Sequence, residues 1–386
     1  MLKKICFFSG TRAEYGILKP LLYKIKEEES FKLQFIVSGM HLSCEFGLTY
    51  REIEEDGFDI DDKIEILLSS DSAVALCKSM GLGLIGYSEV LNKLKPDMLV
   101  VLGDRFEVLV VVEVAMILNI PIVHLSGGEA TFGVMDEAIR HSITKMSHLH
   151  FTTNENHRKR VIQLGEDPGT VFNYGSLCVD NILNLSLLSK QELEKKLNIT
   201  FKQKNLLLTF HPVTLEKNTS EKYLNNLFEV LSTFDNIMII FTKANADIYG
   251  RSINKMLEAY VKKMSKNIKL FDSLGSLYYL SLMQYVDAVV GNSSSGIVEA
   301  PSFKIGTINI GDRQEGRAQA DSIINTKSSK ESIRAAFKEL YSNSFQEKLK
   351  NTKNLYGDGQ AAQKITDKLK KYEYRDVLKK KFYKIL

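Results

Sequence analysis

Apolar residues fall along the chain in short blocks, and longer segments with helical spacing separate the blocks. Each block is apolar at nearly every position and rich in β-branched residues. Such blocks are typical of strands buried on both faces, as in a parallel sheet covered by helices. The pattern therefore predicts an α/β protein with strands at residues 5–8, 33–37, 98–102, 122–125 and 171–174, and again at residues 206–210, 237–241, 268–271, 288–290 and 307–310.

These predicted strands form two series, and 386 residues are enough for two domains with separate cores. The join is expected near residues 175–187, just before Ser189-Lys190-Gln191-Glu192, a sequence typical of a capping box at the start of a helix. We predict two Rossmann-like domains, at residues 1–176 and 177–365, which face each other across a cleft.

The sequence favours a cytoplasmic protein without a membrane segment. The most hydrophobic stretch, residues 108–125, contains Glu113, Asn119, Pro121 and His124, whereas a membrane-spanning helix needs about 20 apolar residues with few charges. The apolar run at the N-terminus is too short for a signal peptide. Four cysteines without C-x-x-C spacing indicate neither a disulfide scaffold nor a zinc ribbon.

The charge is concentrated at the C-terminus. The chain has 51 Lys and Arg against 47 Asp and Glu, a formal net charge of +4. Residues 368–386 hold eight basic and two acidic residues, so the other 367 residues hold 43 and 45 and are slightly acidic. A nucleic-acid-binding face is therefore not indicated. We predict instead that residues 366–386 form a basic helix whose apolar stripe packs on the first domain rather than on a membrane.

Ligands of open parallel sheets bind beyond the carboxyl ends of the strands, so the residues that follow each predicted strand are the candidates for function. Residues 9–16 form a small-residue turn that leads into a helix, and Arg12 lies in that turn. Free backbone N–H groups and an arginine suit a phosphate. An ordinary turn with a surface arginine is an equally good interpretation of these residues alone.

Acidic residues follow two further strands. Asp104 and Arg105 come after residues 98–102, Glu129 comes after residues 122–125, and Asp136 begins the next helical segment. Carboxylates gathered at one rim of a sheet suit general acid and base chemistry, because burial and mutual repulsion separate their pKa values. Helix capping and pairing with arginine are the structural alternatives.

The second half repeats this arrangement with other chemistry. His211 follows a strand and suits a phosphate contact or acid–base work. Gly291-Asn292-Ser293-Ser294-Ser295-Gly296 offers hydroxyls and N–H groups to a pyrophosphate, Glu299 suits ribose hydroxyls, and Arg313 would complement the anion. A plain serine-rich turn is the alternative. No spacing typical of a metal site occurs, and we expect neither a metal nor a cofactor.

Together these segments resemble those of the hydrolysing UDP-N-acetylglucosamine 2-epimerases, in order over residues 3–320. The likeness rests on Gly10-Thr11-Arg12-Ala13-Glu14, Gly103-Asp104-Arg105, Gly127-Gly128-Glu129, residues 136–141, Gly291-Asn292-Ser293-Ser294 and Gly311-Asp312-Arg313-Gln314. The resemblance implies a GT-B-like fold with the active site in the interdomain cleft, a C-terminal helix that returns to the first domain, and a homodimer or homotetramer.

The resemblance also implies a reaction. UDP-N-acetylglucosamine loses UDP to give 2-acetamidoglucal, and water then adds to give N-acetylmannosamine for sialic-type nonulosonic acid synthesis. It implies Asp104, Glu129, Asp136 and His211 as catalytic residues. The UDP and sugar contacts that it implies are Arg12, Arg105, Asn245, Leu274, Tyr279, Ser293, Ser294, Glu299 and Arg313.

Three alternatives remain open from the sequence. The first is the same reaction on UDP-2,4-diacetamido-2,4,6-trideoxyglucose, for the legionaminic acid pathway. The motifs do not distinguish this substrate from UDP-N-acetylglucosamine, and residues 243–247 depart from the family pattern near the sugar. A GT-B glycosyltransferase would share the fold and the serine-rich turn but gives no reason for three acids in the first domain. A non-catalytic UDP-sugar sensor would bind without turnover.

Overall fold

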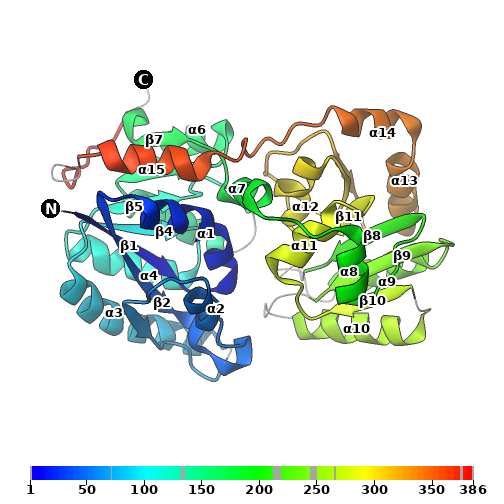
Figure 1. The fold of residues 1–386 in the computed structure, drawn as a ribbon, viewed down its shortest axis with the longest axis horizontal. Coiled ribbons are helices and arrows are strands. Elements are labelled where there is room, and N and C mark those ends of the chain that lie inside the picture. Colours follow the sequence, from blue (N-terminus) through cyan, green and yellow to red (C-terminus); the bar gives the residue numbers. More distant parts are fainter. Residues whose placement is uncertain are drawn as a thin grey trace. The chain divides into compact units, whose positions relative to one another are not determined.

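The computed structural model describes residues 2–70, 72–131, 135–211, 219–243, 250–264, 267–373 and 377–384. Contacts divide the chain into two compact units, which Figure 1 shows as separate α/β bodies. The first unit comprises Met1–Glu129, Met135–Asn181 and Tyr356–Leu386, and the second comprises Ala130–Val134 and Ile182–Leu355. The predicted α/β class with two parallel-sheet units is confirmed.

The first unit contains a seven-stranded parallel sheet with the order β3-β2-β1-β4-β5-β6-β7. Its strands are β1 Lys3–Ser9, β2 Phe31–Ser38, β3 Asp62–Ile64, β4 Met98–Leu102, β5 Ile122–Leu125, β6 Leu149–Thr152 and β7 Val171–Asn173. Its helices are α1 Arg12–Glu27, α2 Tyr50–Glu55, α3 Ala73–Leu94, α4 Phe106–Ile117, α5 Met135–Met146, α6 Glu155–Gln163, α7 Leu177–Asn184, which continues into the second unit, and α15 Ala361–Lys371, with short 3-10 turns at Gly39–Leu42, Cys44–Phe46 and Pro168–Thr170.

The second unit repeats the plan with six parallel strands in the order β10-β9-β8-β11-β12-β13. Its strands are β8 Lys204–Thr209, β9 Ile237–Thr242, β10 Ile268–Phe271, β11 Ala288–Gly291, β12 Gly306–Ile310 and β13 Ile323–Thr326. Its helices are α8 Lys190–Leu197, α9 Thr219–Leu231, α10 Gly250–Lys263, α11 Gly275–Met283, α12 Ser295–Val298, α13 Lys330–Leu340 and α14 Asn343–Lys350, with a 3-10 turn at Ala300–Phe303. The predicted capping box is present, because the Ser189 hydroxyl accepts from Glu192 N and the Glu192 carboxylate accepts from Ser189 N.

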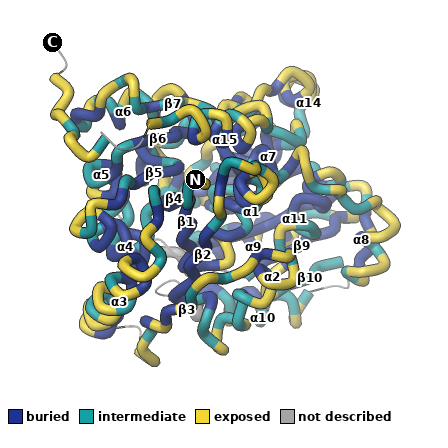
Figure 2. The backbone as a smooth tube through the Cα atoms, turned by 60° about the vertical axis from the view of Figure 1, so that its left-hand side comes forward, coloured by how far each residue is buried: buried dark blue, intermediate teal, exposed yellow. Residues whose placement is uncertain are grey.

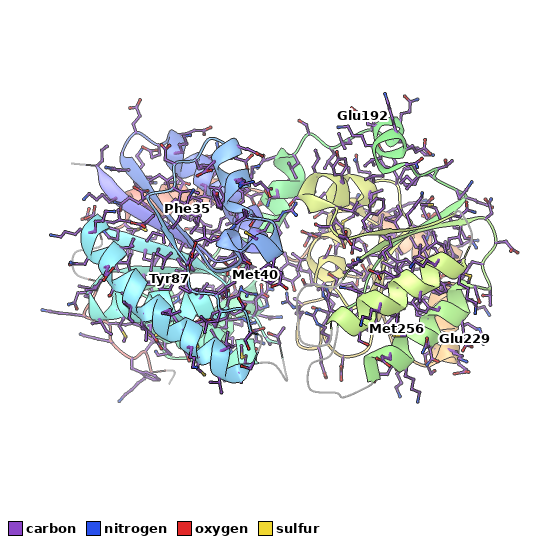
Figure 3. All side chains as sticks on the ribbon, turned by 90° about the horizontal axis from the view of Figure 1, so that it is seen from below. Phe35, Met40, Tyr87, Glu192, Glu229 and Met256 are labelled. Carbon is purple, nitrogen blue, oxygen red and sulfur yellow. The ribbon has the colours of Figure 1, made fainter. Side chains whose placement is uncertain are left out.

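Each sheet is buried on both faces, which explains why its central strands are apolar at most positions. Adjacent residues of β2 point to opposite sides: Phe35 packs with α1, whereas Ile36 packs with α3 and α4. Figure 3 labels Phe35 and Tyr87, which belong to these two cores. Figure 2 shows the buried strands of the first unit inside a layer of partly exposed helices.

Both sheets have the strand order of a doubly wound fold. The order reverses between β1 and β4 in the first unit and between β8 and β11 in the second. A crevice forms at such a reversal because the connections on its two sides leave in opposite directions, and ligands of these folds bind there. The turns after these four strands are therefore the positions to examine.

The C-terminal segment differs from the predicted helix. Helix α15 begins at Ala361 and ends at Lys371, and residues 377–384 contain no helix. The helix packs against α1 in the first core, and the Asp180 carboxylate accepts from the N–H groups of Ala361 and Ala362 at 3.1 and 2.7 Å.

Residues 377–384 contact the first unit at specific positions, although Lys379, Lys381 and Lys384 are exposed. Tyr383 N donates to Gly165 O at 2.8 Å, and Lys380 forms a 2.6 Å ion pair with the buried carboxylate of Glu166. Glu166 also contacts Lys145 and His150. The prediction of one helix over 366–386 is therefore wrong for residues 377–384, which are not helical.

Helix α3 is unusually apolar for its position. By length and composition it is the one helix among the described residues that could cross a membrane. Its inner face is packed: Gly83 lies against Val110 of α4, and Tyr87 is fully buried. Core helices satisfy the same criterion, so this finding is weak evidence for a membrane segment.

Candidate active site

A buried arginine organises the carboxyl end of β4 in the first unit. Arg140, on α5, is 1% exposed and donates through Nε to Asp104 Oδ2 at 2.9 Å, with a second bond from Nη2 to the same oxygen. Its Nη1 donates to Glu129 O at 3.0 Å and to Glu137 Oε2 at 2.7 Å. Burial lowers the pKa of Arg140, but Asp104 and Glu129 raise it by more. One cation therefore fixes Asp104 and the backbone of Glu129.

The turn that carries Glu129 has an unusual backbone. Ser126 has φ 63° and Gly128 has φ 78°, and a Cβ on Gly128 would lie 2.3 Å from His157 O. Only glycine fits at this close approach. Arg160 donates to Gly128 O and holds the turn from α6. The same turn brings Glu129 within electrostatic range of Arg140.

The β4 side of the site is braced by a histidine. His124 of β5 is fully buried, and its Nε2 lies 2.8 Å from Gly103 O, directly before Asp104. Burial lowers the pKa of His124 to about 3, so the ring is neutral and Nε2 donates to the carbonyl. This contact fixes the backbone position from which the Asp104 carboxylate projects.

A buried acid, Glu14, lies in the turn after β1 and the first residues of α1. Glu14 accepts from Gly10 N at 2.7 Å and from Thr11 N at 3.1 Å, completing a capping box for α1. Burial raises the pKa of Glu14 to about 8, although Arg105 lowers it. Among the described groups, Glu14 Oε1 has no hydrogen-bond partner. No role was predicted for Glu14 from the sequence.

Arg105 and Arg12 take different positions. Arg105 donates to both oxygens of the fully buried Glu107 at 3.1 Å, and burial lowers its pKa less than Glu107 and Glu14 raise it. Asp136 also raises the pKa of Arg105, which places its carboxylate within electrostatic range. Arg12 is the first residue of α1, half-exposed, and pairs with Glu52 at 3.1 Å.

In the second unit an asparagine joins the ends of β8 and β11. His211 N donates to Asn292 Oδ1 at 2.7 Å, and Asn292 Nδ2 donates to His211 O at 2.8 Å. Burial, with a smaller contribution from Arg313, lowers the pKa of His211 to about 3. His211 is therefore neutral in the absence of a ligand.

The serine-rich turn is shaped by its glycine and braced by an arginine. Gly291 has φ 133°, and a Cβ there would lie 2.0 Å from Thr209 O. Asn292 O accepts from Arg313 Nη1 at 3.0 Å and from Gln314 Nε2 at 2.8 Å. The loop after β12 thus holds the turn after β11, and Arg313 lies beside it as predicted.

The remaining predicted contacts surround this turn. Ser293 and Ser294 are partly exposed, and Ser295 donates to Glu299 Oε2 at 2.6 Å. Burial raises the pKa of Glu299. Leu274 is buried in the core beside α11, and burial raises the pKa of Tyr279 to about 12, so its hydroxyl keeps its proton. Asn245 lies outside the described residues.

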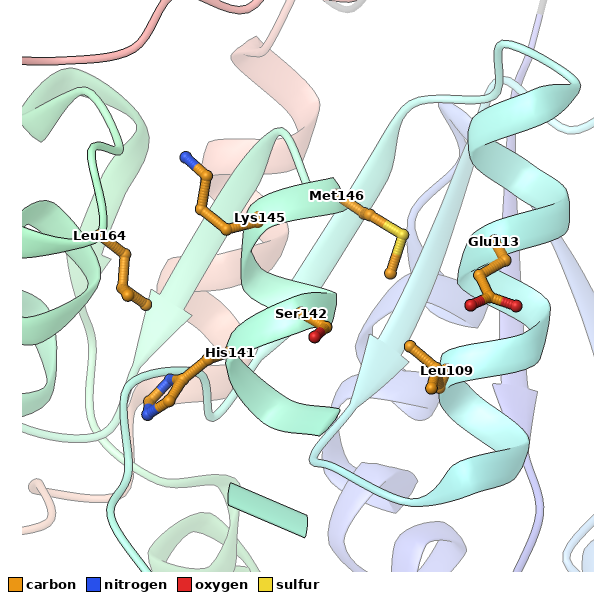
Figure 4. A pocket seen from close by; sticks show the side chains of 7 residues that line it. All are labelled: Leu109, Glu113, His141, Ser142, Lys145, Met146 and Leu164. Carbon is orange, nitrogen blue, oxygen red and sulfur yellow. The ribbon is translucent and has the colours of Figure 1, made fainter. Parts of the chain in front are cut away.

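Two open depressions do not coincide with these sites. One of about 560 Å³ lies along α4 and α5 and is lined by Leu109, Glu113, His141, Ser142, Lys145, Met146 and Leu164 (Figure 4). It contains none of the predicted site residues. A second, of about 470 Å³, adjoins Gly311 and Asp312. Within the ranges that the structure describes, no group of three His, Cys, Asp or Glu side chains suits a metal ion.

Arg140 is central to the site, but no role was predicted for it from the sequence. It appeared only within residues 136–141. Its signal is its place in the helical pattern of α5, where Arg140, Ile143 and Thr144 form the buried face. A charged residue at a core position requires a charged partner. A charged residue on this face was the signal that could have shown that Arg140 needs a charged partner, but it does not show which acid that is.

Comparisons with known proteins agree with this arrangement. A family model described as UDP-N-acetylglucosamine 2-epimerase matches residues 23–370. The chain is 48% identical to a Campylobacter jejuni protein named GDP/UDP-N,N'-diacetylbacillosamine 2-epimerase (hydrolyzing), over 89% of each chain. It is 32% identical over 84% of each chain to a Neisseria meningitidis UDP-N-acetylglucosamine 2-epimerase.

A solved structure shows the same fold. The Neisseria meningitidis UDP-GlcNAc 2-epimerase bound to UDP-GlcNAc superimposes with a TM-score of 0.82 at 18% identity, covering 96% of this chain and all of the other. The GT-B-like expectation is thereby confirmed.

Proposed function

Because this chain belongs to the UDP-N-acetylglucosamine 2-epimerase family, we propose that it is a hydrolysing 2-epimerase of a nucleotide-linked 2-acetamido sugar. The observation that carries the proposal is the Asp104–Arg140–Glu129 group at the strand-order reversal of the first unit. It supplies carboxylates with distinct surroundings, and the second unit supplies a turn suited to a diphosphate. The proposed reaction requires both sets of residues to engage one substrate.

The reaction has two steps. A base removes the proton at C-2, the C-1–oxygen bond breaks, and the nucleoside diphosphate leaves with that electron pair, which gives a 2-acetamidoglucal. Water then adds its oxygen to C-1 and a proton returns to C-2 on the opposite face, which gives the manno epimer. Asp104, Glu129 and Asp136 are our candidates for these proton transfers.

The carboxylates differ in environment, which suits separate roles. Asp104 shares a salt bridge with Arg140, while Glu129 is held through its backbone carbonyl and its charge lies within electrostatic range of the same arginine. His211 is neutral when the site is empty because its pKa is about 3. An adjacent diphosphate would favour its protonated form, so His211 would support the leaving group.

We assign nucleotide binding to the second unit. Ser293, Ser294 and the backbone N–H groups of their turn would hold the diphosphate, and Arg313, already braced against Asn292, would add charge. Glu299 would accept from ribose hydroxyls. Leu274, Tyr279 and Asn245 keep their proposed contacts with base and sugar, and Arg12 and Arg105 would face the substrate from the first unit.

The relatives favour the diacetamido sugar as substrate. The Campylobacter jejuni protein at 48% identity is named for N,N'-diacetylbacillosamine, and so is a Legionella pneumophila protein at 32% over 96% of each chain. UDP-N-acetylglucosamine is the second candidate, supported by the Neisseria relative.

Since the four cysteines are free, we place the protein in the reducing cytoplasm.

Product analysis in deuterated water tests the proposal. Purified protein is incubated with UDP-diacetylbacillosamine, its GDP analogue or UDP-N-acetylglucosamine. We expect free nucleoside diphosphate by chromatography and a manno sugar with deuterium at C-2 by NMR. Retention of the C-2 proton, an epimeric nucleotide sugar, or no release from any substrate would each contradict it.

Variants separate catalysis from binding. We expect Asp104→Asn and Glu129→Gln to bind UDP normally by calorimetry but to release at least about 100-fold less nucleotide. Asp97→Asn is the matched control, because Asp97 precedes the same strand at its amino end, and its carboxylate accepts from Lys4 N at 2.8 Å. An acid variant that loses binding and turnover together would show a structural role.

A further inference from the structure

The backbone of the turn after β1 is held by contacts within the first unit. Glu14 Oε2 accepts from Gly10 N at 2.7 Å and from Thr11 N at 3.1 Å. Gly10 O accepts from Met40 N at 2.9 Å, and the Ser9 hydroxyl donates to Thr11 O at 3.1 Å. The turn stands where the strand order reverses, and there the N–H groups at the start of a helix ordinarily bind the phosphate of a ligand. In this chain an acid side chain already uses these N–H groups.

The Glu14 carboxyl group takes the place that an external anion would take. Its Oε2 binds two successive backbone N–H groups, which is the geometry of an anion at a helix N-terminus. Glu14 is only 7% exposed, so the side chain fills this place rather than bordering it. Glu192, which has the same capping-box position at the start of α8, is exposed. Burial therefore distinguishes Glu14 from an ordinary capping residue.

Both arginines beside this turn already have acid partners. Arg105 donates to both oxygens of Glu107 at 3.1 Å, and Arg12 pairs with Glu52 at 3.1 Å. An arginine in an ion pair still offers N–H donors, but its partner compensates much of its charge. This end of the first sheet therefore suits an uncharged polar ligand better than a phosphate.

Two glycines pack the turn closely against Glu107. A Cβ on Gly10 would lie 3.3 Å from Glu107 Cβ, and a Cβ on Gly39 would lie 3.1 Å from Glu107 Oε1. Gly39 also has φ 58°, a conformation that favours glycine. This close packing fixes the direction of the Gly10 N–H group, which donates to Glu14.

We propose that Glu14 is a specificity-determining residue, whose side chain occupies the anion site of the first unit and so reserves this end of the sheet for the uncharged sugar of the substrate. The statement about the sugar rests on the proposed function, whereas the occupied anion site does not. The serine-rich turn of the second unit differs, because the Ser294 side chain makes no capping bond there. A nucleotide sugar would therefore bind in one direction, with its diphosphate at the second unit.

Removing the Glu14 side chain tests whether it fills an anion site. Each protein is saturated with UDP, so that the second unit is occupied, and is then titrated with inorganic phosphate in a calorimeter. We expect Glu14→Ala to bind one phosphate at least about tenfold more tightly than the wild type, because two N–H groups and the helix dipole become available. Glu14→Gln keeps an amide oxygen in the same place and should exclude phosphate as the wild type does. A folded Glu14→Ala protein that binds phosphate no better than the wild type would overturn the proposal.

Glu192→Ala is the matched control for the loss of a capping box. Glu192 accepts from Ser189 N at 2.8 Å, so its removal uncaps α8 in the same way. This variant should gain no phosphate binding, and a gain equal to that of Glu14→Ala would overturn the assignment. Glu14→Ser retains a polar group in the first turn of α1 and should show the same gain as Glu14→Ala. The test therefore does not depend on the stability of one variant.

Inhibition kinetics test whether the phosphate competes with the sugar. Phosphate at concentrations that do not affect the wild type should raise the KM of Glu14→Ala for the nucleotide sugar and leave its kcat unchanged. A variant that binds phosphate without this change in KM would overturn the role in substrate binding. If the wild type neither binds UDP nor releases it from a nucleotide sugar, the proposed function fails. The phosphate titration would still decide whether Glu14 fills an anion site.

Discussion

Replacing Arg140 tests whether one buried cation positions the acids of the first unit. Arg140 makes two bonds to Asp104, one to Glu137 and one to the Glu129 carbonyl, while its own side chain is 2% exposed. Arg140→Met removes the charge and all four of these hydrogen bonds. Arg140→Lys keeps a charge but has one donor group, which cannot reach all three acceptors in the same geometry.

The structure sets the expected magnitudes. Removing one partner of a buried ion pair costs about 3–5 kcal/mol. Because Asp104 and Glu137 are 29% and 23% exposed, water relieves part of that cost, so we expect about 3 kcal/mol of lost unfolding free energy for Arg140→Met. For Arg140→Lys we expect about 1–2 kcal/mol, and a kcat about 100-fold lower because the carboxylate is displaced.

Urea unfolding and the rate of nucleotide release measure these two effects separately. Arg158→Lys is the control, since Arg158 on α6 donates to Val171 O at 2.9 Å and lies away from the acids. Arg158→Lys should change the rate of nucleotide release by no more than about threefold and the unfolding free energy by no more than about 1 kcal/mol. A stably folded Arg140→Lys enzyme with wild-type kcat would refute the positioning role.

Three further predictions concern stability. Burial raises the pKa of Glu14 from 4.5 to about 8, so wild-type unfolding free energy should fall relative to Glu14→Gln as pH rises from 5 to 8, measured by urea titration. Burial raises the pKa of Glu166, but its hydrogen bonds lower that pKa overall to about 2. The unfolding free energy that the wild type gains over Glu166→Gln should therefore be complete above pH 4.5 and decline towards pH 2, as measured by acid unfolding. Gly291→Ala should lower the unfolding free energy by more than about 3 kcal/mol and abolish UDP binding in calorimetry, because its Cβ would meet Thr209 O. The control Gly311→Ala, where φ is 83° and a Cβ would meet open space, should lower it by only about 1–2 kcal/mol.

The apolar blocks predicted the sheets because burial on both faces leaves a clear pattern. Strands β4, β5 and β10 begin and end at the predicted residues. Strands β3, β6 and β13 were missed because they are three or four residues long and include polar positions, such as Asp62-Lys63 in β3 and Asn325-Thr326 in β13. Strands β3 and β13 lie at sheet edges, where pairing with a neighbour determines the strand more than composition does, whereas β6 lies between β5 and β7.

The candidate residues were found from their place after strands, because topology alone brings such turns to one edge. Their partners were not predictable, since the pairing of Arg140 with Asp104 joins residues 36 positions apart. The C-terminal basic segment shows the same limit. Its helical periodicity suggested a helix, but Lys380 binds Glu166, and only the folded structure shows that these two residues lie together.

The division of the chain has a consequence for synthesis. All residues of the second unit have been made once the ribosome passes Leu355, but the first unit still lacks α15, whose Ala361, Ile365 and Leu369 complete its core. The N-terminal unit is thus the last to be finished, and its α1 surface stays uncovered while the second unit folds. A nascent chain stalled before Ala361 should therefore recruit chaperones to its oldest part, and a fragment ending at Asn181 should aggregate when expressed alone.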